Sequence, residues 1–135
     1  MASVGPLHLL HLQVSDSHLY YAMKLIKTKI QIFNQDVSAF GPGKQQLLIA
    51  IIDHGSISAA AKSMKMSYKR AWDLVNAMND SFAEPLVITK IGGSRGGGAE
   101  LTVLGHQVLS LYKTAVQNSE HFIDVQMADL IKLLK

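Results

Sequence analysis

Residues 56–64, SISAAAKSM, and residues 67–78, SYKRAWDLVNAM, are two short amphipathic stretches with only two residues between them. Ala60 and Ala61 are small enough to let two crossing helices approach closely. Two short helices joined by so tight a turn predict a helix-turn-helix. Glycine is common in such a turn, so Lys65 is its least typical residue, although lysine adopts left-handed backbone geometry at modest cost.

The second stretch has the features of a helix that reads DNA. Ser67 is the expected N-cap, and Tyr68, Lys69 and Arg70 occupy the first turn after it. A helix N-terminus favours phosphate through its dipole, and such helices meet base edges with their first residues. We therefore expect these four residues to contact DNA, with Lys65 of the turn beside them.

Further along the same stretch, Lys69, Asp73 and Asn76 share one outward side by their spacing of three and four residues. Asn76 is suited to reading adenine, whereas a carboxylate at Asp73 repels DNA unless it accepts from cytosine or orients a neighbour. The alternative is an ordinary solvated helix face. Trp72 is predicted to pack at the core or its shoulder rather than to stack on a base.

The glycine-rich segment GGSRGGG, residues 92–98, follows the helical region. It lacks both the Gly-Lys-Ser/Thr ending and the G-x-G-x-x-G spacing of phosphate-binding loops. It lies between two predicted strands, Leu86–Ile91 and Ala99–Thr102, so it predicts a hairpin that acts as a wing on DNA, or else a hairpin with no ligand. The wing residues expected to contact DNA are Lys90, Ser94 and Arg95.

Before the central motif, branched residues alternate with polar ones over residues 26–32, which predicts a half-buried strand. Residues 41–43, Gly-Pro-Gly, then interrupt regular secondary structure, and Lys44–His54 is a predicted helix with Gly55 as its C-cap. Ser56 is the expected N-cap of the next helix. The residues that this first helix is expected to bury are Leu47, Leu48, Ile51 and Ile52.

After Thr102, a plausible N-cap, an amphipathic pattern continues to the C-terminus. Roughly 30 helical residues form a rod of ~45 Å, longer than the remaining core can cover. The surplus apolar stripe predicts a homodimer. The alternative is a break near Asn118-Ser119 that gives two packed helices.

Composition limits the classes of function. The 135 residues suit one domain, with residues 1–22 as an N-terminal extension of no clear role and residues 23–135 as a mainly helical winged helix-turn-helix with a small β wing. The net charge of +3 permits a polyanionic partner. Without cysteines there are no disulfides or thiolate sites. No apolar run reaches the ~18 residues of a membrane helix, and no signal peptide is expected, so we predict a cytoplasmic protein.

The six histidines do not cluster with carboxylates, and no nucleophile motif or H-E-x-x-H sequence occurs. We therefore predict no enzyme activity, no metal and no cofactor.

Together, three segments resemble the N-terminal DNA-binding domain of the ModE family, winged-helix regulators of molybdenum uptake and use with a more distant kinship to LysR-type regulators. The segments are GSISAAAKSMKMSYKRAWDLVNAMN (55–79), GGSRGGGAELT (92–102) and GHQVLSLY (105–112). The likeness extends over roughly residues 24–125 and is specific only in combination.

The resemblance implies a homodimer on a palindromic operator, held by the C-terminal helix and N-terminal elements. It also implies that Ser67–Arg70 face the DNA groove, with Arg95 in the wing. Full-length members continue into molybdate-binding domains, whereas this sequence stops at Lys135, so the resemblance implies a regulator without its own sensor. Two other functions stay open: a winged-helix module that binds a protein, and a regulator that responds to a small oxyanion.

Overall fold

The computed structural model describes residues 25–91 and 97–135. Two compact units are present: Lys29–Phe122, and a second to which residues 25–28 and 123–135 belong. The predictions for residues 1–22, Ser94 and Arg95 lie outside the described residues. In chain order the elements are β1 (Ile32–Asn34), β2 (Val37–Phe40), α3 (Pro42–His54), α4 (Ile57–Ser63), α5 (Tyr68–Ser81), β3 (Val87–Lys90), β4 (Gly98–Leu101), α6 (Val103–Gln126) and α7 (Ala128–Ile131).

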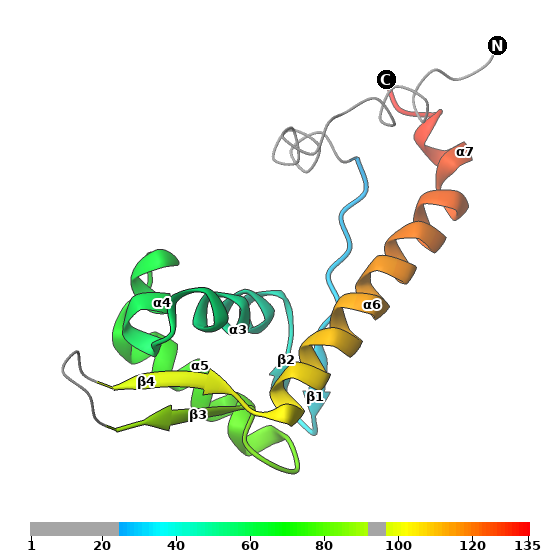
Figure 1. Cartoon of the computed structure of the whole chain (residues 1–135). Coiled ribbons are helices and arrows are strands. Elements are labelled where there is room, and N and C mark those ends of the chain that lie inside the picture. Colours follow the sequence, from blue (N-terminus) through cyan, green and yellow to red (C-terminus); the bar gives the residue numbers. More distant parts are fainter. Residues whose placement is uncertain (1–24, 92–96) are drawn as a thin grey trace. The chain divides into compact units, whose positions relative to one another are not determined.

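Helices α3, α4 and α5 form the predicted helical group, with the hairpin β3–β4 beside it (Figure 1). Helix α3 begins at Pro42, two residues before its predicted start, because proline is favoured in the first turn of a helix. It ends as predicted at Gly55, whose φ of 76° is left-handed. The Ser56 hydroxyl caps α4 by accepting from the amide of Ala59 at 3.0 Å.

The turn between α4 and α5 is built around Lys65, whose φ of 55° is the left-handed geometry expected there. The Met66 amide donates to the Ala61 carbonyl at 3.0 Å, and the Lys65 amide donates to the Lys62 carbonyl at 3.1 Å. This pair of bonds is the Schellman arrangement, which usually has glycine at the left-handed position. The lysine therefore fits the motif because the two bonds offset its backbone strain.

The core confirms most of the predicted apolar sides. Ala60 and Ala61 of α4 are fully covered, as their close-approach role requires. Ile52 is an error in the prediction: it is 48% exposed, because it follows Ile51 by one residue and points about 100° away from the buried stripe. The core side chains are Phe40, Leu47, Leu48, Ala50, Ile51, Ile57, Ala60, Ala61, Ala71, Val75, Met78, Leu86, Val87, Ala99, Leu101 and Tyr112.

The predicted strand at residues 26–32 is wrong. Residues 26–31 form no regular structure, and the first strand, β1, begins only at Ile32 and pairs antiparallel with β2 through a tight turn at Gln35 (φ 54°). The period-two pattern is real, because residues 26, 28 and 30 are half-buried and those between them exposed. An extended chain has this period with or without a partner strand, so the pattern alone did not define a sheet.

The buried Lys44 ammonium, whose pKa is lowered by desolvation, donates to the Ser38 carbonyl of β2.

The predicted wing strands are confirmed to within one residue. β3 and β4 pair antiparallel, from Val87 opposite Leu101 to Lys90 opposite Gly98. Thr102 then caps α6 as expected, since its hydroxyl accepts from the amide of Gly105 at 3.0 Å.

Helix α6 is continuous through residues 118 and 119, so the alternative of a break there is wrong. It stops at Gln126, however, and α7 is a separate turn of four residues. Tyr112 anchors the first half of α6. Its ring lies edge-on to the Phe40 ring, with the centroids 4.9 Å apart, and its hydroxyl donates to the Ile30 carbonyl at 2.8 Å.

Candidate nucleic-acid interface

The N-terminus of α5 presents a polar, exposed first turn. The Ser67 hydroxyl accepts a hydrogen bond from the amide of Arg70 at 3.1 Å, so Ser67 is the N-cap of α5, as predicted. Tyr68, Lys69 and Arg70 are exposed, and the side chain of Arg70 forms no ion pair with the rest of the described chain. The turn therefore presents an exposed guanidinium next to a helix N-terminus, a combination suited to phosphate.

The two sides of α5 differ sharply in chemistry. Lys69, Asp73 and Asn76 are exposed on the outward side, as their spacing predicted. Lys69 Nζ and an Asp73 carboxylate oxygen lie 2.9 Å apart, with the side chains 85% and 61% exposed. An ion pair so exposed adds little stability but orients the lysine. The inward side of the helix buries Ala71, Val75 and Met78.

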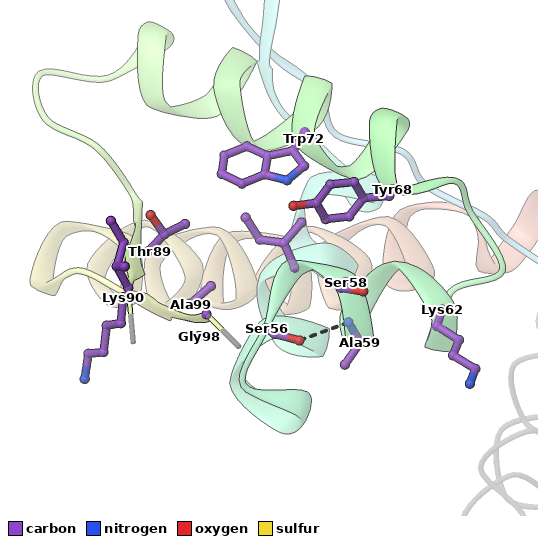
Figure 2. Close-up of a pocket in the computed structure, with 13 residues that line it drawn as sticks. Ser56, Ser58, Ala59, Lys62, Tyr68, Trp72, Thr89, Lys90, Gly98 and Ala99 are labelled. Carbon is purple, nitrogen blue, oxygen red and sulfur yellow. Dashed lines mark hydrogen bonds between the residues drawn. The ribbon is translucent and has the colours of Figure 1, made fainter. Parts of the chain in front are cut away.

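A groove of about 920 Å³ separates α5 from the wing (Figure 2). The Tyr68 and Trp72 rings line one wall and meet edge-on, with centroids 6.1 Å apart. Lys62 and Lys90 lie at opposite ends of the groove. Its remaining polar lining comes from hydroxyl groups of α4, its cap and β3, namely Ser56, Ser58 and Thr89.

Trp72 is half-buried and packs against the core, so its predicted shoulder role is confirmed. The sequence did not indicate that its ring also lines a groove, or that Ser58 and Lys62 face that groove from α4. The spacing of Ser58 and Lys62 by four residues was the available signal, because residues four apart share a helix face.

The wing contributes charge that is partly neutralised. Lys90 Nζ lies 2.9 Å from a Glu100 carboxylate oxygen on the paired strand, and both side chains remain about half exposed or more. Lys65 is also exposed, on the turn before α5. The predicted contact set is thus divided: Ser67, Tyr68, Lys69, Arg70, Asn76 and Lys65 lie on the helix-turn-helix, Lys90 lies on the wing, and Ser94 and Arg95 are not described.

Within residues 25–91 and 97–135, no three His, Asp or Glu side chains are grouped so that they could hold a metal ion. None of the helices in this part of the chain is both long and apolar enough to cross a membrane.

Residues 44–106 match the family model described as "Bacterial regulatory helix-turn-helix protein, lysR family". Over these residues the chain is similar to a LysR-type helix-turn-helix domain. The match extends from α3 through the wing to the first turn of α6 and therefore contains the site described above. The family is regulatory rather than catalytic, in agreement with the prediction that the chain is not an enzyme.

Curated relatives extend the likeness. The chain is 42% identical over 76 residues to the molybdenum transport protein ModE of Azotobacter vinelandii, covering 56% of this chain and 28% of that protein. It is 35% identical over 111 residues to the transcriptional regulator ModE of Haemophilus influenzae, covering 82% and 44%. The chain thus spans less than half the length of these relatives, and the predicted resemblance to ModE proteins is confirmed.

Among solved structures, a point mutant of MepR from a multidrug-resistant S. aureus clinical isolate is similar, with a TM-score of 0.52 and 13% identity, over 93% of this chain and 99% of that one. At that identity the likeness concerns the fold alone. It agrees with a mainly helical, winged-helix-like architecture.

Proposed function

We propose that the LysR-type domain binds double-stranded DNA in a sequence-specific manner, as a homodimer that regulates transcription. The observation that carries the proposal is the first turn of α5, where a capped helix N-terminus presents Tyr68 and an Arg70 that has no ion pair among the described residues. In this arrangement α5 enters a major groove and the wing lies on the flanking backbone. Lys69, Arg70 and Asn76 supply the donors for base edges and phosphates.

Charge distinguishes this proposal from a module that binds a protein. Cations surround the groove and the start of α5, whereas a protein-binding face needs an apolar centre with few charges. The two aromatic rings of the groove lie between Lys62 at one end and Lys90 at the other, beside apolar lining residues such as Ile57 and Ile91. Among the described residues, the exposed basic side chains of this face are Lys62, Lys65, Lys69, Arg70 and Lys90.

The homodimer is supported by an exposed stripe along α6. Leu111, Ala115, Asn118 and Phe122 are spaced four, three and four residues apart, and all are exposed. That spacing is the seam along which two helices pack in a coiled coil, and one asparagine within such a seam fixes its register. Leu111 and Phe122 are each 63% exposed, which a second copy of the helix relieves.

A dimer places two copies of α5 in successive major grooves about 34 Å apart, so the operator is a palindrome. The printed names of the relatives are a molybdenum transport protein and a transcriptional regulator. Promoters of molybdenum-related genes are therefore the first place to seek the operator.

Selection of bound duplexes from a random DNA pool tests the proposal. We expect a palindromic consensus and an affinity that falls steeply with salt, with a slope set by the number of phosphates contacted. Recovery of no consensus, together with binding that is indifferent to salt, contradicts the proposal. Calorimetry with molybdate, sulfate and phosphate, without DNA, tests the oxyanion alternative separately.

A further inference from the structure

The junction between α5 and the wing is held by one side chain, Asn79. Its amide oxygen accepts from the backbone amides of Leu86 and Val87, at 2.9 and 3.1 Å. Its amide nitrogen donates to the Val87 carbonyl at 3.1 Å. Asn79 lies in the last turns of α5 and Val87 is the first residue of β3, so these three bonds join the helix directly to the base of the wing.

The opposite side of the same segment is held by the start of α6. The Thr102 amide donates to the Leu86 carbonyl at 2.9 Å, and the Thr102 hydroxyl donates to the Pro85 carbonyl at 2.7 Å. Leu86 is fully buried, and each polar group of its backbone has a partner. Its amide donates to the Asn79 side-chain oxygen, and its carbonyl accepts from the Thr102 amide. The base of the wing is therefore clamped between two residues that lie outside it.

We propose that Asn79 is a positioning residue for DNA binding: it fixes the angle of the wing relative to α5, so that Lys90 and its strand reach the flanking backbone while α5 occupies the major groove. This inference rests on the proposed DNA-binding function. The geometry favours it because Asn79 is half-buried and all three of its bonds are directed to the wing base, none to the outward side of α5. Loss of those bonds releases the wing base from α5, while the bonds from Thr102 to the wing base and from the Ala99 amide to the Gly55 carbonyl remain. The first turn of α5 is two to three helical turns away and is not altered.

The test uses the duplex selected by the wild-type chain and compares its binding to the wild type and to Asn79→Ala. We expect roughly tenfold weaker binding and a salt slope smaller by about one for each wing-phosphate contact that is lost. Hydroxyl-radical footprinting is expected to lose protection on the flanks and to keep it in the central major grooves. A merely destabilised protein lowers the bound fraction but keeps the slope and the footprint of the wild type, so these readouts separate positioning from stability.

Ser81→Ala is the matched control, because it removes a hydrogen bond to the Ala77 carbonyl at the same end of α5 without touching the wing. It is expected to keep the wild-type slope and footprint. If circular dichroism shows that Asn79→Ala is unfolded, Asn79→Asp replaces it: this variant keeps the acceptor for Leu86 and Val87, loses the donor, and is expected to shift the footprint in the same direction by less. A wild-type footprint from the folded variant overturns the inference alone. Failure of the wild-type chain to select a duplex overturns the proposed function as well.

Discussion

Helices α5 and α6 are both amphipathic, but the chain covers their apolar sides to different extents. On α5, Ala71, Val75 and Met78 are all buried, so the helix is complete within its own domain and its other side is free for a ligand. On α6, only Gly105 and Tyr112 are buried, and the apolar side chains of its second half are largely exposed. A helix whose apolar side is fully covered presents its polar side to a partner, whereas one that is left uncovered needs another helix. Five substitutions test this contrast.

The largest effect is expected from Phe122→Glu on the uncovered part of α6. Removing the burial of a phenylalanine costs about 2 kcal/mol per protomer, hence about 4 kcal/mol in a symmetric dimer where the change occurs twice. Sedimentation equilibrium is expected to show a dimer dissociation constant raised roughly a thousandfold. Operator binding weakens with it, while the monomer keeps its circular dichroism spectrum.

Gln117→Glu is the control for this change. It places the same charge on an exposed position of α6 that lies outside the stripe, so the dimer is expected to persist. Equal dissociation in the two variants contradicts packing along the stripe.

Gly105→Ala tests the covered end of α6. A Cβ at Gly105 would meet the Leu86 carbonyl oxygen far inside van der Waals contact, and that oxygen belongs to the clamped backbone of the wing base. We expect the free energy of unfolding to fall by about 3 kcal/mol in urea denaturation, because backbone cannot move aside as a side-chain tip can. Gly43→Ala is the control: nothing lies within 4 Å of its added Cβ, so a small stabilisation is expected, and an equal loss at both sites contradicts the steric account.

Arg70→Ala tests the free side of α5. The side chain has no ion pair among the described residues, so the fold is expected to keep its stability. Operator affinity falls by about 2 kcal/mol, or roughly thirtyfold, as for the loss of one direct contact. Lys113→Ala, which removes an exposed cation from α6, is expected to leave fluorescence-anisotropy binding curves nearly unchanged. Equal losses from the two variants indicate general electrostatics rather than a contact by α5.

Local chemistry explains which parts of this fold the sequence predicted. The caps at Ser56 and Ser67 depend on one hydroxyl and a nearby amide, and the helix end at Gly55 depends on the left-handed backbone that glycine adopts freely, so residue type alone located them. The hairpin β1–β2 was not predicted, because its turn has Gln35 rather than glycine at the position where φ is positive. For the extended residues 26–31, burial alternates without a strand partner, and partners are set by tertiary structure.

The sequence predicted the part of the candidate site that lies within one helical turn, but not the part that several elements form together. Ser67–Arg70 could be assigned from one capped turn, because neighbours along a helix have a fixed geometry. The groove could not, because α4, α5 and the wing form it together. Asn79 was missed for the same reason: its partners, Leu86 and Val87, are seven and eight residues away across a non-helical connection.

Ser67→Ala measures how much the cap contributes to the free side of α5. The lost bond to the Arg70 amide leaves an unsatisfied helix N-terminus, and the free energy of unfolding is expected to fall by about 1 kcal/mol in urea denaturation. DNA affinity is expected to fall as well, since the cap orders the turn that carries Arg70. Ser110→Ala, at an exposed site within α6, is expected to change neither quantity. A loss of stability with unchanged DNA affinity would show that the turn orders itself on DNA without its cap.

Asp73→Asn is expected to give the smallest change in stability. The direction in which it changes operator affinity is the most informative of the five results. The exposed ion pair with Lys69 contributes at most a few tenths of a kcal/mol, so urea denaturation is expected to change little. Removing the carboxylate releases Lys69 and takes a negative charge from the side of α5 that faces the polyanion. Operator affinity at low salt is therefore expected to rise, with a steeper dependence on salt. A fall in affinity confined to the selected operator, with binding to other duplexes increased, would instead identify Asp73 as a residue that accepts from cytosine, and the outward side of α5 would then read bases through its acid as well as its cations.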